Sequence, residues 1–162
     1  MTRKLIRIRP AGLDDYPAVC RLITSQEELF RVFPSGSWPF NLRQLHHLAE
    51  KRTDLTVVTD NDEIVGFADL YDMVPRTRAF IGNIILRASH RRQGIGKRLV
   101  QHMLDKIFTL HELPEARISV FEDNTPALTL YTQLGFKTCG RELRKTPDGR
   151  TVNLLQMKLV RL

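Results

Sequence analysis

Residues 84–99 read Ile84-Ile-Leu-Arg-Ala-Ser-His-Arg-Arg-Gln-Gly94-Ile-Gly96-Lys-Arg-Leu99. An apolar run of strand character passes into a basic loop, then into two glycines, then into a segment with helical periodicity. Glycine allows a ligand to approach the main chain closely. The first N–H groups of a helix have no acceptors within it, and the helix dipole adds positive potential there. This stretch therefore predicts an anion site for a phosphate or diphosphate.

Two familiar phosphate-binding loops do not match the stretch. A Walker loop requires Ser or Thr after Gly-Lys, but Gly96-Lys97 is followed by Arg98. A dinucleotide fingerprint requires a third glycine, but position 99 is leucine. A plain glycine turn with solvated basic side chains is the simpler alternative, and spacing alone leaves it open.

The segments on either side predict a sheet with helices. Periodicity and turn residues indicate helices starting near residues 14, 41, 94 and 126. Strands alternate with helices only in the second half, which indicates a mixed sheet with helices on both faces. The expected strands are 5–9, 55–59, 64–71, 79–87, 117–121, 136–143 and 151–159.

Composition sets the class of protein. The 162 residues show no repeat or linker, which predicts one domain over residues 1–162. With 42% hydrophobic residues, the chain is not expected to be disordered, and its longest apolar stretch is too short to cross a membrane. The net charge of +7 suits a nucleic acid, an anionic membrane or an anionic cofactor. Two cysteines favour a reducing compartment, so we expect a cytoplasmic protein.

A second motif follows the glycine loop and reads Asn124-Thr-Pro-Ala127-Leu-Thr-Leu130-Tyr131-Thr-Gln-Leu-Gly135-Phe136. We expect Thr125 to cap a short helix that ends at Gly135. Ala127, Leu130, Tyr131 and Leu134 then share one apolar face, with Tyr131 at its edge. From spacing alone, a core tyrosine is the simpler interpretation.

Together, the two motifs resemble the GNAT superfamily of acetyl-CoA-dependent N-acetyltransferases. Arg91-Arg-Gln-Gly94-Ile-Gly96 resembles the Q/R-x-x-G-x-G/A loop of that family. The downstream motif resembles its N-x-x-A-x-x-L-Y-x-x-x-G-F segment. The resemblance implies the α/β (α+β) GNAT fold, with a mixed, mostly antiparallel sheet of about seven strands and about four helices. It also implies a homodimer as a family-level expectation.

The resemblance further implies that acetyl-CoA is the acyl donor. No metal is expected, because the adjacent His46 and His47 cannot chelate one ion well and His111-Glu112 lacks the second His of an HExxH motif. The loop amides would bind the diphosphate of acetyl-CoA, strand 84–86 would pair with its pantetheine arm, and Tyr131 would protonate the departing thiolate. A phenol, with an ordinary pKa near 10, suits that step. The residues expected to contact the cofactor are Ile84, Ile85, Leu86, Arg91, Arg92, Gln93, Gly94, Ile95, Gly96, Lys97, Arg98, Asn124, Ala127 and Tyr131.

The general base and the acceptor are left open at this point. Many family members carry a carboxylate on the strand before the loop, but Phe80-Ile-Gly-Asn-Ile-Ile-Leu86 contains none. Asp69, Asp72, Glu27 and Glu28 are candidates, although each is expected to be a solvated surface charge. The expected acceptor is a primary amine of a small molecule or protein. Aminoacyl-tRNA acetylation and a non-catalytic acyl-CoA sensor are the alternatives, and no membrane partner is expected.

Overall fold

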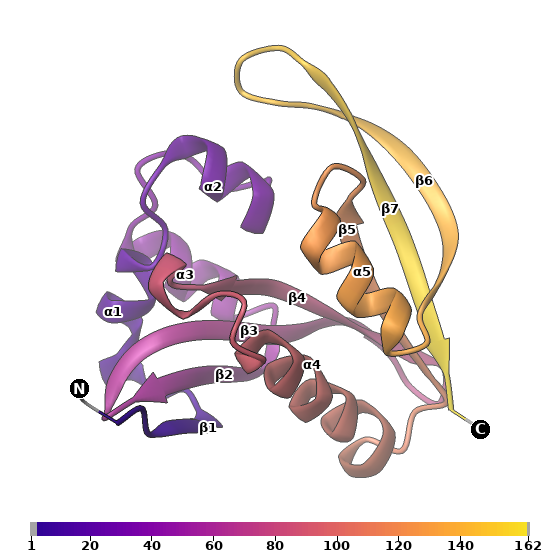
Figure 1. Cartoon of the computed structure of the whole chain (residues 1–162), viewed down its shortest axis with the longest axis horizontal. Coiled ribbons are helices and arrows are strands. Elements are labelled where there is room, and N and C mark those ends of the chain that lie inside the picture. The colour runs from indigo at the N-terminus through magenta and orange to yellow at the C-terminus, as the bar shows by residue number, and fades with distance from the viewer. Residues whose placement is uncertain (1–2, 162) are drawn as a thin grey trace.

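The computed structural model describes residues 3–161 and contains a seven-stranded sheet in the order β1-β2-β3-β4-β5-β7-β6 (Figure 1). Neighbouring strands are antiparallel except β4 and β5, which are parallel. This confirms the predicted mixed, mostly antiparallel sheet. The strands are β1 (Ile6–Pro10), β2 (Thr53–Asp60), β3 (Glu63–Val74), β4 (Arg78–Leu86), β5 (Glu115–Phe121), β6 (Lys137–Lys145) and β7 (Thr151–Val160).

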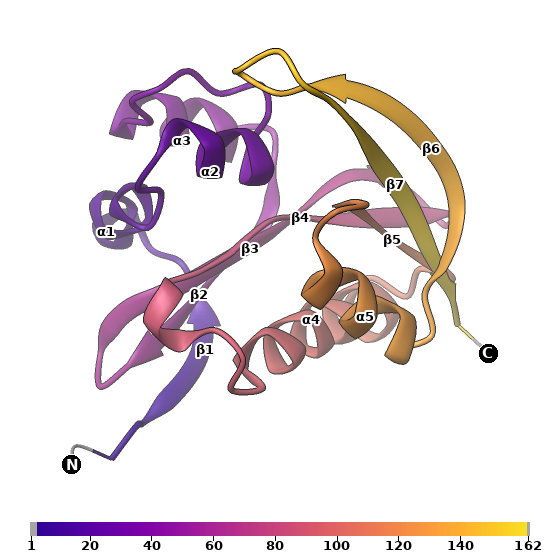
Figure 2. The ribbon, with the colours of Figure 1, turned by 45° about the horizontal axis from the view of Figure 1, so that its top comes forward.

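The helices cover both faces of the sheet, as predicted. Figure 2 shows the helices between β1 and β2 on one face of the sheet and the later helices on the other. The first group is α1 (Tyr16–Arg21), α2 (Gln26–Val32) and α3 (Leu42–Ala49), and the second is α4 (Ile95–Asp105) and α5 (Thr125–Gln133). No helix in the described part of the chain is both long and apolar enough to cross a membrane.

Two hydrophobic cores form, one on each face of the sheet. Successive strand residues point to opposite faces, so Val58 and Val65 enter the larger core while their neighbours Val57 and Ile64 enter the smaller. On α4 and the turn after it, apolar residues at four-residue spacing supply the larger core. These residues, Ile95, Leu99, Met103 and Ile107, are all 3% exposed or less.

The helices differ from the prediction in two places. The region from residue 14 onward forms two helices because Ser25 caps a new one, its hydroxyl accepting a bond of 3.1 Å from the Glu28 N–H. Residues 3–161 thus contain five α-helices in place of the expected four or so. The helix expected to run from Gly94 to about Leu110 instead ends at Asp105, and Lys106–Leu110 forms a π-helical turn.

The two parallel strands separate part-way along their length. β4 and β5 are paired from Arg78 with Glu115 to Ile81 with Ile118, and not beyond. On its other side, β4 stays paired to β3 as far as Leu86, which faces Gly66. Within the described residues, the edge of β4 over 82–86 that faces β5 therefore has no strand partner. We call this stretch the open edge of β4.

Candidate active site

A cavity of about 550 Å³ lies where β4 and β5 separate. The open edge of β4 supplies Gly82, Asn83 and Ile84, and β5 supplies its last three residues. The end of α2 and the loop after it, the N-cap and last turns of α5, the β6–β7 hairpin, Arg52 and the β3 residues Tyr71 and Asp72 also line it. Segments that are far apart in the sequence thus meet at one place.

Tyr131 of α5 lines this cavity and is 6% exposed. Its ring packs near Phe136, with the ring centroids 6.0 Å apart. Burial raises the pKa of the Tyr131 phenol above its usual value of 10, because the charged form loses solvation. The side chain is thus neutral at pH 7 and holds a proton next to the cavity, in addition to contributing to the core.

Asn124, and not Thr125, caps α5, so the predicted cap was wrong by one residue. The Asn124 Oδ1 accepts a bond of 3.4 Å from the Ala127 N–H, and Thr125 is already the first helical residue. Asn124 also lines the cavity. The cap uses the Ala127 N–H, and the Ala127 side chain packs against the larger core. The expected cofactor contacts of these two residues stay predictions.

The glycine loop forms the start of α4, as the sequence predicted. Gly94 has φ of +80° at the N-cap position, and no side chain caps the helix among the described residues. A Cβ placed on Gly94 would meet no atom within 4 Å, so the space beside the loop is open. The first N–H groups of α4 are therefore available to an external acceptor. Ile95 can contribute only its main chain, because its side chain is 3% exposed in the core.

Several side chains of the loop are used to hold its shape. Arg91 Nε donates a bond of 3.0 Å to the Leu86 carbonyl, and its Nη2 lies 3.6 Å from the Glu28 carboxylate. Gln93 donates to the Ser89 carbonyl at 3.0 Å and accepts from the Lys4 ammonium. Arg91 is nevertheless exposed, as are the other cations of the loop, Arg92, Lys97 and Arg98.

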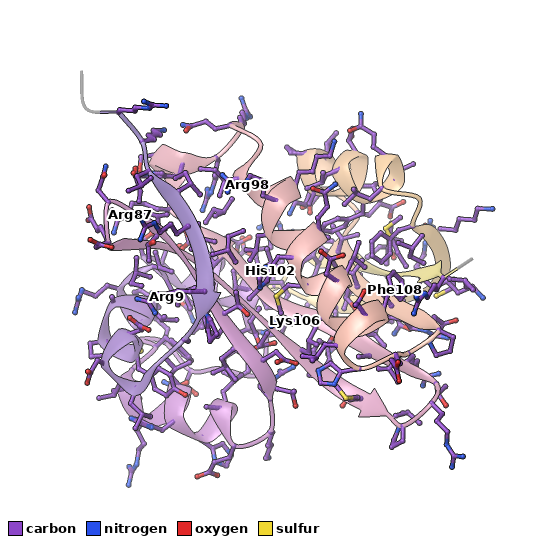
Figure 3. The ribbon with its side chains drawn as sticks, turned by 90° about the horizontal axis from the view of Figure 1, so that it is seen from below. Arg9, Arg87, Arg98, His102, Lys106 and Phe108 are labelled. Carbon is purple, nitrogen blue, oxygen red and sulfur yellow. The ribbon has the colours of Figure 1, made fainter. Side chains whose placement is uncertain are left out.

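The basic character of this face fades beyond the loop. Figure 3 shows Arg98, His102 and Lys106 along α4 and its following turn, with Arg9 and Arg87 on neighbouring segments. Arg9 and Arg87 are each 2.7 Å from a carboxylate, of Asp15 and Glu63 respectively. Burial, with Lys106 nearby, lowers the pKa of His102, so its ring is neutral at pH 7. On this face, Arg9, Arg87 and His102 therefore add little to the positive charge beside the glycine loop.

The three predicted contact residues of β4 point to different places. Ile84 lines the cavity, and Leu86 packs against the larger core. Ile85 is 4% exposed and lies in the smaller core on the opposite face. A ligand along the open edge can therefore reach Ile85 only through its main chain.

Asp69 was expected to be a surface charge, and that expectation was wrong. Its side chain is fully buried, and neither carboxyl oxygen has a hydrogen-bond partner within residues 3–161. The nearest cation is Arg52, whose Nη1 lies 3.9 Å from the Asp69 Oδ1. Burial raises the pKa of Asp69 well above its usual value, and the attraction of Arg52 opposes this only in part.

The other base candidates differ in their access to the cavity. Asp72 is exposed and lines the cavity. Glu27 accepts a bond of 3.1 Å from Arg31, and Glu28 is close to Arg91 and Thr24. Asp72 is thus the one candidate of the four that lines the cavity. Among residues 3–161, no three His, Cys, Asp or Glu side chains are grouped to hold a metal ion.

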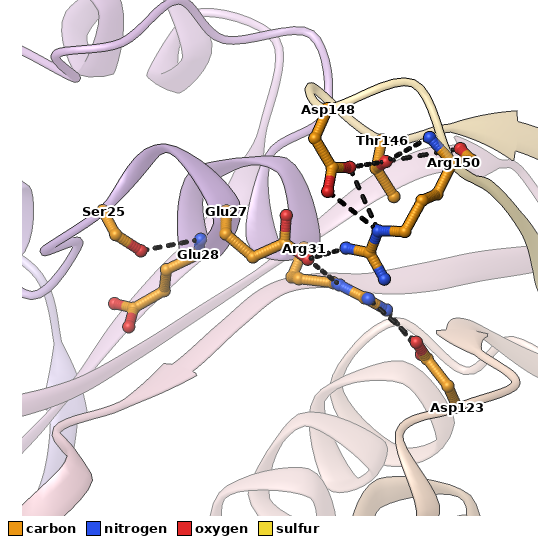
Figure 4. Close-up of polar contacts among 8 residues, drawn as sticks. All are labelled: Ser25, Glu27, Glu28, Arg31, Asp123, Thr146, Asp148 and Arg150. Carbon is orange, nitrogen blue, oxygen red and sulfur yellow. Dashed lines mark hydrogen bonds and ion pairs between the residues drawn. The ribbon is translucent and has the colours of Figure 1, made fainter.

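A chain of ion pairs connects three segments beside the cavity (Figure 4). Arg31 of α2 donates a bond of 2.8 Å to Asp123, just before α5, and this bond lowers the pKa of that carboxyl. Glu27, which also accepts from Arg31, lies 3.5 Å from Arg150 in the β6–β7 turn. Arg150 in turn pairs with Asp148 at 2.9 Å. The bridge ties α2 to the segment just before α5 and to the hairpin.

Comparison with known proteins agrees with this geometry. Residues 20–136 match the family model described as the acetyltransferase (GNAT) family. The chain belongs to the GNAT family. A peptidyl-lysine N-acetyltransferase, YjaB, of Salmonella typhimurium is 40% identical over 84 residues, which are 52% of this chain and 50% of that protein. The [ribosomal protein bS18]-alanine N-acetyltransferase of Escherichia coli is 30% identical over 95 residues, 57% of this chain and 62% of that protein.

The chain thus spans half to three fifths of these two relatives. The solved spermidine N-acetyltransferase of Vibrio cholerae, in complex with CoA and spermine, covers 96% of this GNAT chain and 95% of its own, with a TM-score of 0.81 and 20% identity. At this identity the likeness concerns the fold alone. The fold that the two sequence motifs implied is confirmed.

Several residues that line the cavity of this GNAT chain belong to no sequence motif, so the sequence alone could not predict their place in the site. Arg31, Arg52 and Tyr71 come from α2, from the loop before β2 and from β3, and only tertiary packing brings them together. Asn83 adopts φ of 51° in β4 and donates a bond of 2.9 Å to the Val32 carbonyl, fixing α2 to the open edge. The Gly82-Asn83 pair within an apolar strand was the one available signal, because such pairs often mark an irregularity.

Proposed function

We propose that this chain transfers an acetyl group from acetyl-CoA to a primary amine of a small molecule or a protein. The observation that best supports the proposal is the cavity at the separation of β4 and β5, with Tyr131 in its wall. The open edge of β4 leads directly into the glycine loop. One continuous path therefore joins an anion site to a cavity that contains a proton donor.

The residues present fit the cofactor. The uncapped N–H groups at the start of α4 and the open space beside Gly94 suit a diphosphate. Unpaired main-chain groups along 82–86 suit the amides of a pantetheine arm. When bound, acetyl-CoA supplies an acyl group activated as a thioester. Arg92, Lys97 and Arg98 add positive charge beside the diphosphate site.

The reaction requires two proton movements, and the cavity offers a group for each. A bond forms between the amine nitrogen and the acetyl carbon while the carbon–sulfur bond breaks. Tyr131 gives its proton to the departing sulfur. Burial makes this phenol a weaker acid, but the same surroundings raise the basicity of a thiolate beside it.

The proton lost by the amine needs an acceptor other than Tyr131 within the same cavity. We assign this role to Asp72, because it lines the cavity while Asp69 is sealed from it and Glu27 is held by Arg31. Glu142 also lines the cavity, but it accepts a bond of 2.6 Å from Arg144. A carboxylate within reach of the amine meets the geometric requirement for a general base.

The test is release of free thiol from acetyl-CoA, measured with a panel of small amines, peptides with free N-termini or lysines, and aminoacyl-tRNA. We expect release that depends on a small amine or a peptide, with acetylated product confirmed by mass spectrometry. If none of these acceptors causes thiol release, the proposal is contradicted, and the alternative of a non-catalytic acyl-CoA sensor is favoured. Release with aminoacyl-tRNA alone would replace the proposed acceptor class.

A further inference from the structure

A second hollow, of about 950 Å³, adjoins the first along α3. The two hollows share Phe33, Ser35, Arg52, Tyr71 and Asp72, so an acceptor can extend from one into the other. Gln44 fixes the shape of the second hollow, because its side-chain amide bonds both main-chain groups of Ser37 at 2.8 and 2.9 Å. We call this second hollow the α3 groove.

The α3 groove is strongly basic. Arg43, His47 and Lys51 recur at four-residue spacing, so they lie along one face of α3 and the turn after it, and all three are exposed. Neither Arg43 nor Lys51 has a carboxylate within 4 Å in the described part of the chain, while His47 lies 3.8 Å from Glu50. With Arg52, three permanent cations face a single lining carboxylate, Asp72.

Arg52 is a fixed cation at the junction of the two hollows. Its guanidinium lies 4.2 Å from the centroid of the Tyr71 ring, and its Nη1 faces buried Asp69 at 3.9 Å. The side chain is 17% exposed, so it is held in place yet borders both hollows. A cation held in this way loses little conformational freedom when an anion binds to it.

Resting on the proposed function, we propose that the α3 groove binds an acidic polypeptide segment that follows the acetylated amine. The amine end enters the cavity beside Tyr131, and the acidic side chains meet Arg52, Lys51 and Arg43. At the rise of a helix, Arg43 and Lys51 are roughly 12 Å apart along the axis. About four residues of extended chain span that distance. A cationic polyamine is repelled by the same charges.

An RNA acceptor suits the groove less well than a peptide. Single-stranded RNA is typically held by aromatic rings on which bases stack. Here Arg52 covers the face of Tyr71, and the other shared ring, Phe33, packs edge-on against Phe40 with the centroids 5.5 Å apart. The serines and dispersed cations of the groove instead suit main-chain amides and carboxylates.

The test measures binding directly, by fluorescence anisotropy with CoA present. Three labelled peptides share a free N-terminal alanine and continue with four acidic residues, four glutamines or four lysines. We expect the acidic peptide to bind about tenfold or more tighter than the glutamine peptide, and the lysine peptide to bind weakest. The preference should shrink as salt is raised.

Charge reversal in the groove, R43E/K51E, should abolish or invert this order of affinities. The control K137E/K158E makes the same charge change on two exposed strand residues that pair with each other at the start of β6 and near the end of β7, and it should keep the parent order. In Figure 1 these strand ends lie beside the C-terminus and away from α3. Both variants alter exposed side chains, and circular dichroism checks that they fold.

Equal affinity for the three peptides would overturn the proposal, as would an unchanged order in R43E/K51E. Tighter binding of an aminoacylated RNA minihelix, in competition with the acidic peptide, would also overturn it in favour of an RNA acceptor. Acidic-peptide binding without acetyl transfer would support the groove and contradict the proposed reaction. Acetyl transfer with no preference for acidic peptides would support the proposed reaction and contradict the proposed role of the groove.

Discussion

At the scale of single residues, Tyr131 combines a core position with a place in the wall of the cavity. Replacing Tyr131 by Phe removes the hydroxyl and keeps the packing against Phe136. We expect kcat to fall by roughly 10²–10⁴, because the departing thiolate loses its proton donor. Affinity for acetyl-CoA should stay within about twofold of the parent, since the ring remains. Steady-state kinetics and calorimetry measure the two quantities.

The matched control is Tyr16→Phe, which removes the hydroxyl of another buried tyrosine, in the smaller core against His46. Its turnover should equal that of the parent. If Tyr131→Phe also keeps parental turnover, Tyr131 has no part in the chemistry and its position is explained by packing alone.

Asp69 gives a prediction about stability and pH. Its pKa in the folded state is raised by burial above the unfolded value. Its contribution to stability is therefore complete below the unfolded pKa and is lost as pH rises through the folded pKa. Replacing Asp69 by Asn removes this titration. The Tm of Asp69→Asn minus that of the parent should accordingly increase from pH 4 upward and then level off.

Asp15 serves as a control, because its stabilisation should depend on pH in the opposite direction to that of Asp69. A hydrogen bond from Arg9 lowers the folded pKa of Asp15, so its stabilisation is present above the unfolded pKa and is lost as pH falls. The Tm advantage of the parent over Asp15→Asn should therefore decrease toward low pH. A pH-independent Tm difference for Asp69→Asn would contradict the account of its burial.

At the scale of elements, the start of α4 is the proposed binding site for the diphosphate of acetyl-CoA. Gly94 has φ of +80° and open space around its Cβ position. In Gly94→Val, the branched side chain would occupy the space proposed for the diphosphate and would strain the loop. We expect acetyl-CoA affinity to fall by roughly tenfold or more, as measured by calorimetric titration.

A control at Gly149 distinguishes the two effects of valine at Gly94, which are filling the ligand space and straining the backbone. It has φ of +85° and equally open surroundings, but lies in the β6–β7 turn. Gly149→Val should therefore lower the free energy of unfolding by about 1–2 kcal/mol, as Gly94→Val does, because both variants place valine at a positive φ. Unlike Gly94→Val, it should keep the acetyl-CoA affinity of the parent. Equal affinities in the two valine variants would remove the glycine loop from cofactor binding.

At the scale of the whole molecule, the parts predicted best are those specified by local pattern. The apolar spacing of α4 and the turn after it placed Ile95, Leu99, Met103 and Ile107 correctly in the core. Asn41 caps α3 as predicted, accepting a bond of 3.0 Å from the Gln44 N–H. Such features depend on residues within one or two turns of each other, so the sequence contains the whole signal.

The parts that were missed depend on long-range packing. Asp69 is in a strand whose pattern does not show that Arg52 and Tyr71 cover its side chain. The Arg31–Asp123 pair joins residues 92 positions apart. The separation of β4 from β5 follows from pairing on both sides of β4, which no single segment encodes. Much of the acceptor side of the site is built from contacts of this kind, whereas the cofactor side has local motifs.

The central claim is that the glycine loop and the open edge of β4 direct acetyl-CoA into the cavity beside Tyr131. A crystal structure of the complex with CoA tests it most directly. We predict diphosphate oxygens within hydrogen-bond distance of main-chain N–H groups of residues 92–97, and the thiol in the cavity next to Tyr131. A nucleotide bound elsewhere, or a thiol that does not enter the space between β4 and β5, would contradict the account.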